Sequence, residues 1–175
     1  MNKRSQVWIE TVVYTLIALI IIGAVLGFVK PKIEELQDKA IVEQSLGMLQ
    51  QIDTEISSIV KGGQGNQRVL EISIKKGELT IDSVDDSIKF YMEGAYTYSE
   101  PGMNISVGGI TAYTQKIGSV NKITLTKTYK DYDLMYDNSN IIKNLEKSPT
   151  PYNLVVYNEG GDSTTNKIKI NFAIS

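Results

Sequence analysis

The 175-residue chain contains neither cysteine nor histidine. The lack of cysteine excludes disulfides and thiolate metal sites, and the sequence therefore gives no information on whether the compartment is oxidising or reducing. The lack of histidine removes the usual general base near neutral pH and the commonest metal ligand. We therefore expect a protein that is not an enzyme and that carries no cofactor.

A strong net charge is also missing. The chain has 18 basic and 20 acidic side chains, which give a net charge of −2, and no basic patch stands out along the sequence. Nucleic-acid-binding domains usually present such a patch. We therefore expect no nucleic-acid partner.

The sequence does contain a long apolar segment near its start. Residues 12–29 include no charged side chain. As a helix they would be about 27 Å long, which is close to the roughly 30 Å hydrocarbon core of a bilayer. We predict a helix over residues 6–29 that spans a membrane. The remaining residues have the polar composition of one soluble domain.

A second helical pattern follows over residues 30–61. Its apolar residues recur at spacings of mainly three and four, which indicates one apolar stripe on a helix. Pro31 either kinks one long helix or begins a second one. Because the pattern resumes without a loop, we expect a single kinked helix that ends at the glycine-rich residues 62–66. The expected stripe consists of Ile33, Leu36, Ala40, Leu46, Leu49, Ile52, Ile56 and Ile59.

Beyond residue 66 the hydrophobic period changes to two, which is typical of strands. Residues 68–82 read as a hairpin, and residues 137–151 as the longest loop. Short strands separated by turn residues predict an antiparallel sheet or sandwich. The expected fold class is α+β, with a long hydrophobic N-terminal helix followed by a β-rich outer domain over residues 66–175. Further strands are expected at residues 88–92, 110–117, 120–129, 154–157 and 168–174.

The residues just before the apolar segment carry the most specific signal. Lys3 and Arg4 are basic, Ser5 is small, Gln6 follows, and Glu10 is the fifth residue counted from Gln6. This order resembles the class III signal peptides of archaeal type IV pilins, over residues 3–30. The resemblance implies a leader of residues 1–5 that is cleaved after Ser5. The sequence departs from the family in having Ser5 where glycine or alanine is usual, and in having Trp8 where a small residue is common.

The resemblance also implies a function and partners. It predicts the structural subunit of an extracellular type IV pilus-like filament, a helical polymer of identical copies. A prepilin peptidase would cleave the leader, and an assembly ATPase with a platform membrane protein would drive polymerisation. The subunit would first be a single-pass membrane protein with its N-terminus inside, and later part of a filament at the cell surface. Adhesion is one of the roles that such filaments have.

Two features of the apolar segment are candidates for assembly. The Glu10 carboxylate either lies in the headgroups or pairs with the α-amine that cleavage exposes at Gln6 of a neighbouring copy. Such a pair would set the axial register, because an unpaired charge in an apolar bundle is costly. Gly23 and Gly27 form a GxxxG pattern, which allows close helix packing but is also frequent by chance in membrane helices.

The outer domain has weaker candidates. Asn104 begins the chain's N-x-S/T sequon and is a candidate for a glycan on an exposed loop, although this tripeptide is also common by chance. Asp131, Asp133 and Asp137 supply oxygen atoms suited to Ca²⁺, but the stretch lacks the glycine and closing glutamate of a calcium loop, so we favour a solvated turn. Nine of the ten tyrosines lie beyond residue 90 and suit core and subunit contacts, or the binding of sugars.

Three alternatives remain open. In the first, the chain is a membrane-anchored β-domain that never polymerises, such as a binding or sensory ectodomain. In the second, it belongs to the pilin class as an archaellum-type or minor subunit. In the third, the apolar segment is a conventional signal peptide that is cleaved near Gly23-Ala24 or Gly27.

Overall fold

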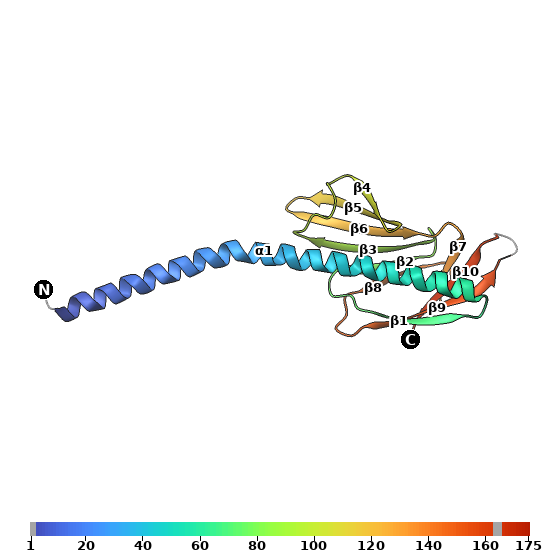
Figure 1. Ribbon diagram of the computed structural model, residues 1–175, viewed down its shortest axis with the longest axis horizontal. Helices are drawn as coiled ribbons and strands as arrows, with labels where there is room; N and C mark the ends of the chain where they lie inside the picture. The colour runs from blue at the N-terminus through green and yellow to red at the C-terminus, as the bar shows by residue number, and fades with distance from the viewer. Residues whose placement is uncertain (1–2, 163–165) are drawn as a thin grey trace.

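The computed structural model describes residues 3–162 and 166–175, with side chains described from Val7 onward. In this part of the chain, one long helix, α1 (Lys3–Gly62), precedes ten strands. Figure 1 shows that the N-terminal half of α1 stands free, whereas its C-terminal half lies against two sheets. The expected α+β class, with a long apolar helix followed by mainly antiparallel sheets, is confirmed.

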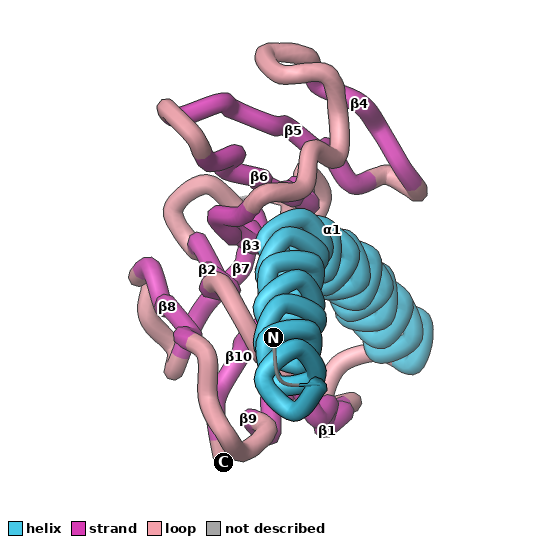
Figure 2. Tube along the Cα trace, turned by 90° about the vertical axis from the view of Figure 1, so that its left-hand side faces the viewer, coloured by secondary structure: helices cyan, strands magenta, loops and turns pink. Residues whose placement is uncertain are grey.

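The two sheets lie around the C-terminal half of α1 (Figure 2). Strand pairs are antiparallel apart from the parallel pair of β7 and β10. The four-stranded sheet has the order β1 (Gln67–Ile72), β9 (Tyr152–Gly161), β10 (Ile168–Ile174), β7 (Tyr132–Tyr136). The six-stranded sheet has the order β4 (Asn104–Val107), β5 (Ile110–Ile117), β6 (Val120–Thr128), β3 (Ser87–Gly94), β2 (Glu78–Asp82), β8 (Ile142–Glu146).

The helix is continuous through Pro31, as the resumed pattern predicted. It changes direction near its middle (Figure 1), and an internal proline is a common cause of such a bend, because its ring displaces the preceding turn. The helix ends where Gly63 adopts a φ of 87°. The side-chain amide of Asn66 donates to the carbonyl of Gly62 at 2.6 Å, and the buried side-chain amide of Asn158 donates to the carbonyl of Ile59 at 3.2 Å. These carbonyls would otherwise lack partners at the helix end.

The stripe that α1 buries is displaced from the predicted one at its N-terminal end. Ile33, Leu36 and Ala40 are exposed and Leu46 is only half-buried, so that part of the prediction was wrong. The pattern had merged two faces of the helix, because spacings of three and four connect neighbouring faces equally well. The buried stripe alternates steps of four and three and consists of Asp38, Val42, Ser45, Leu49, Ile52, Ile56 and Ile59.

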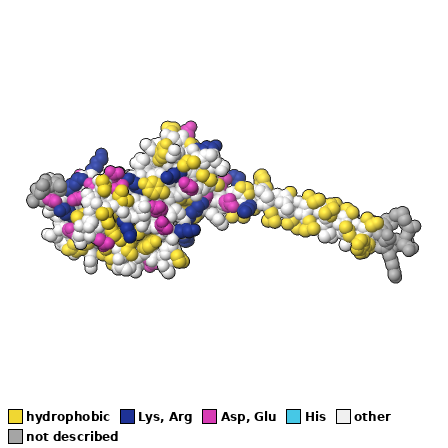
Figure 3. Space-filling view, turned by 180° about the vertical axis from the view of Figure 1, so that it is seen from behind, with side chains coloured by type: hydrophobic (Ala, Val, Ile, Leu, Met, Phe, Trp, Pro, Cys, Tyr) yellow, Lys and Arg dark blue, Asp and Glu magenta, His cyan; other side chains and the backbone are white. Residues whose placement is uncertain are grey.

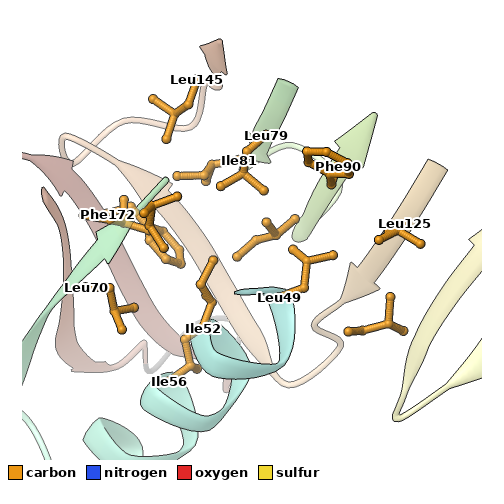
Figure 4. Packing of buried hydrophobic residues seen from close by; sticks show 14 of the residues in the cluster. Leu49, Ile52, Ile56, Leu70, Leu79, Ile81, Phe90, Leu125, Leu145 and Phe172 are labelled. Carbon is orange, nitrogen blue, oxygen red and sulfur yellow. The ribbon is translucent and has the colours of Figure 1, made fainter. Parts of the chain in front are cut away.

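The buried stripe fills the space between the two sheets. Figure 4 shows Leu49 and Ile52 of α1 among side chains from both sheets, including Leu79 and Phe90 of the six-stranded sheet and Phe172 of β10. Each of these side chains is almost fully buried. The C-terminal half of α1 is therefore part of the domain core.

Polar contacts fix α1 on the six-stranded sheet. The ammonium of Lys127 on β6 lies 2.8 Å from the carboxylate of Asp53 and 5.7 Å from the centre of the Tyr129 ring. Burial raises the pKa of the Tyr129 phenol well above its usual range, and the Asp53 charge adds to this rise. These contacts set the position of the helix on the sheet.

The predicted hairpin over residues 68–82 does not form. β1 pairs with β9, whereas β2 pairs with β3 and β8 in the other sheet. Alternation specifies which face of a strand is buried but not which strand it pairs with. The predicted loop over residues 137–151 contains β8, and the short strands β4 and β7 were also missed. The other predicted strands lie within observed ones, apart from Tyr129, which follows the end of β6.

Candidate functional site: the bare half of α1

The N-terminal half of α1 makes no core of its own. Every side chain from Val7 to Lys32 is exposed, with Trp8 at 73% and Phe28 at 76%. Figure 3 shows this segment as a rod covered with apolar side chains. By length and composition the helix is suited to cross a membrane, and none of its most apolar stretch is buried against the described residues. This surface needs a cover from outside the chain.

The two threonine side chains of this segment are compatible with an apolar environment. Thr11 donates its hydroxyl to the carbonyl of Val7 at 3.0 Å, and Thr15 donates to the carbonyl of Thr11 at 2.8 Å. Both hydroxyls are therefore satisfied by the backbone one turn earlier. Glu10 is the only acidic residue in the sequence between Val7 and Val29, and its side chain is exposed.

Gly23 and Gly27 leave open space on the surface of the rod. A Cβ atom placed at either position would have no described atom of the chain within 4 Å, apart from its own helix backbone and sequence neighbours. No contact among the described residues therefore requires a glycine at these two positions. A neighbouring helix is able to approach the backbone closely there.

An exposed apolar seam continues past Pro31. It includes Leu26, Val29, Ile33 and Leu36, at alternating spacings of three and four. Ile33 is 48% exposed and Leu36 is 65% exposed. Because Leu36 and the buried Asp38 are two residues apart, at about 100° per residue, the seam lies on the side of α1 that faces away from the sheets.

The neck between the two halves of α1 covers residues 30–37. Within it, the ammonium of Lys32 lies 2.7 Å from the Glu35 carboxylate. The neck ends at Asp38, whose buried carboxylate accepts a hydrogen bond from the amide of Ala95 at 2.8 Å and pairs with Lys76. Asp38 thus anchors the point at which α1 meets the β-domain.

Sequence reasoning did not identify Asp38 as an anchor. A Cβ atom at Gly94 would lie 2.1 Å from its carboxylate, so a glycine at residue 94 makes room for it. The sequence offered one signal of this burial: Asp38 lies four residues before Val42, on the same face of the helix. An isolated acidic residue on a helix is usually exposed, so that spacing did not single it out.

The cleavage motif lies at the edge of the described chain. The backbone of Lys3, Arg4, Ser5 and Gln6 continues α1, whereas their side chains, and the leader residues 1–2, lie outside the described part. Cleavage after Ser5 and the pairing of Glu10 with Gln6 therefore stay predictions.

The candidates in the outer domain are spread over its surface. Asn104 begins β4, at the edge of the six-stranded sheet, rather than lying on a loop, and it is exposed. Asp131 and Asp137 flank β7, and Asp133 lies within it. Among residues 3–162 and 166–175, no group of three acidic side chains is arranged to hold a metal ion. Of the tyrosines, Tyr129 and Tyr136 are buried.

Comparison with protein-family models, with curated proteins and with solved structures found no match to this chain.

Proposed function

We propose that this protein is the structural subunit of a type IV pilus-like filament, cleaved after Ser5 and assembled through α1. The observation that carries the proposal is the bare apolar half of α1, which is joined without a break to a helix half that is built into the domain core. A rod of this kind holds the β-domain at a defined position relative to its neighbours. The resemblance of residues 3–10 to class III signal peptides supports the same function.

Assembly exchanges lipid neighbours for copies of the same helix. Lipid tails are as apolar as the side chains of Val7–Val29, so cohesion must come from close packing and from a few polar contacts. The open space at Gly23 and Gly27 supports close packing. The seam that includes Ile33 and Leu36 would continue this contact outside the bilayer.

Cleavage would prepare the end of the rod for assembly. It removes the charges of Lys3 and Arg4 and exposes an α-amine at Gln6. Glu10 of a neighbouring copy would neutralise that amine, and the pair would fix the axial register. When one surface binds a different surface of the next copy and the rotation does not close a ring, the copies form a head-to-tail helical array. The prepilin peptidase, assembly ATPase and platform protein are the partners that this pathway needs.

N-terminal sequencing of the membrane-bound and filament forms tests the proposal. We expect filaments whose subunits begin at Gln6. An Arg4→Ala/Ser5→Leu double variant should keep Met1, stay in the membrane and form no filaments. The matched control is Lys30→Ala/Lys32→Ala, which removes basic residues from the other end of the apolar segment and should be cleaved normally.

Filaments built from chains that retain Met1 would contradict the role of cleavage. A wild-type chain that keeps Met1 and never polymerises would instead support the membrane-anchored β-domain, the alternative that the same bare helix also fits.

A further inference from the structure

A hairpin of the six-stranded sheet lies beside the neck of α1. β5 and β6 are joined through Gly118 and Ser119, and Ile117 pairs with Val120 at the last rung of the ladder. The turn points back along α1 toward its N-terminal half (Figure 1). Ser119 and Val120 line a groove together with Glu34 and Gln37 of the neck. The turn therefore lies where α1 leaves the proposed membrane span.

The tip of this hairpin is apolar and exposed. Ile117 is 45% exposed and Val120 is 37% exposed. Gly118 and Ser119 are ordinary turn residues, and β-branched side chains are common in strands, so what distinguishes Ile117 and Val120 is their exposure. These side chains have an apolar surface that the described residues leave partly uncovered.

The charge of the surrounding segment is one-sided. Residues 101–130 contain four lysines and no acidic residue, and with the chain at −2 the rest carries −6. Lys127 is paired with Asp53, whereas Lys116 is exposed beside the turn. Lys122 lies opposite Glu93 in the ladder and 5.5 Å from the centre of the Tyr91 ring. The two strands of the hairpin are thus basic, with Lys116 as the exposed cation beside the turn, while Glu34 and Glu93 line the adjoining groove. Anionic headgroups attract basic segments at short range.

The height of the turn above the membrane also fits. Glu34 and Gln37 follow Val29, the last residue of the uncharged run, by about 8–12 Å along the helix axis. The headgroup layer extends roughly 5–8 Å beyond the hydrocarbon core on each side. Membrane helices tilt by about 20° on average, which lowers a domain attached on one side. A tilt of this size toward the side that carries the hairpin would bring the turn to the headgroups.

We propose that the β5–β6 turn is a second membrane contact of the unassembled subunit. Ile117 and Val120 insert among anionic phospholipid headgroups, and Lys116 lies beside their phosphates. Two weak signals, one apolar and one basic, are a common combination for surface binding. The inference rests on the membrane span in the proposed function but not on filament assembly.

Site-specific labelling tests this contact directly. Because the chain has no cysteine, Ser119→Cys provides a unique position for an environment-sensitive fluorophore. The full chain is placed in phosphatidylglycerol-containing vesicles, at high dilution in lipid, with a nitroxide quencher on the headgroups. We expect a blue-shifted, quenched signal. The control is Lys61→Cys in the last turn of α1, about 40 Å farther along the helix than Glu34, which should stay unquenched.

Variants then separate the two contributions. Lys116→Gln in the Ser119→Cys chain should lower the ratio of bound to unbound turn about fivefold and weaken its salt dependence. Ile117→Ser/Val120→Ser should abolish the blue shift. The thermal unfolding of each variant, which should match that of the parent, shows that the hairpin is folded.

Three results would overturn the inference. The first is a Ser119 label that is as unquenched as the Lys61 label. The second is identical quenching in purely neutral vesicles. The third is quenching that appears only when the chains are crowded. The last result would assign the turn to a contact between copies. A chain that shows the expected quenching but never forms filaments would refute the filament proposal and leave this inference standing.

Discussion

The two halves of α1 are one continuous helix with opposite surroundings. From Val7 to Val29 the side chains are almost all apolar and exposed, whereas from Asp38 onward one narrow stripe is buried and the remaining faces are mostly polar. A helix that is apolar all round needs a cover on every side, but an amphipathic helix needs a cover on one. The sheets cover the second half, whereas no described part of the chain covers the first.

The largest expected effect concerns the bare half. Glu10→Gln keeps the size of the side chain but removes its charge, so the Gln6 amine of a neighbour would be left unpaired in an apolar bundle. Losing one partner of such a pair costs about 3–5 kcal/mol. We expect filament yield, measured by sedimentation and electron microscopy, to fall by more than a hundredfold, while insertion and cleavage stay normal.

The matched control for this change is Glu34→Gln, which removes a carboxylate from the neck and should leave yield unchanged. Normal filaments from the Glu10→Gln chain would exclude the pairing role.

A second experiment tests the contrast between the halves within one pair of variants. Ile52→Ala removes a fully buried side chain from the core and should lower the free energy of unfolding of the β-domain by about 2–5 kcal/mol. Leu19→Ala removes a similar side chain from the bare half, where it is 61% exposed, and should leave domain unfolding unchanged. Thermal unfolding of the detergent-solubilised chain measures both. Equal losses would show that the halves are not independent.

The boundary between the halves should be sensitive to a smaller change. Asp38→Ala leaves the amide of Ala95 and the ammonium of Lys76 without this carboxylate. An unsatisfied buried donor costs about 1–3 kcal/mol, and we expect a loss of that size in chemical denaturation. Lys39→Ala, at the exposed neighbouring position, is the control and should change stability little.

The smallest effect is a pH dependence that belongs to the β-domain alone. Desolvation by itself would raise the pKa of Asp82, but the Lys89 ammonium at 2.7 Å and the amides of Val84 and Asp85 outweigh it, so the pKa lies below its ordinary value. A carboxyl whose pKa is lowered by folding stabilises the fold above its unfolded pKa, and this stabilisation is lost as the pH falls through the folded one.

Asp82→Asn should therefore be less stable than the parent at neutral pH, and the difference should shrink below about pH 4. Denaturant unfolding at a series of pH values measures this. A difference that is constant from pH 7 to pH 3 would contradict the assigned ion pair. Asp85→Asn, which removes the exposed partner of Lys89, should have the smaller effect at neutral pH.

Particular elements show how far sequence reasoning reached. The single helix and its end near Gly62 followed from period and glycine placement, because both are local properties of the backbone. The hairpin of β1 and β2 was wrong because strand partners are chosen by long-range packing that alternation does not encode. Asp38 was missed because its burial depends on Lys76 and the Ala95 amide, which are distant in the sequence.

The sequence by itself determined that a long apolar helix precedes an alternating, strand-rich region, since composition and period are enough to distinguish a rod from a sheet. Only the tertiary structure decided which face of that helix is covered, where the cover begins, and that the β5–β6 turn lies beside the neck. Those properties depend on which distant residues come into contact, and contact is a property of the folded chain rather than of any local stretch.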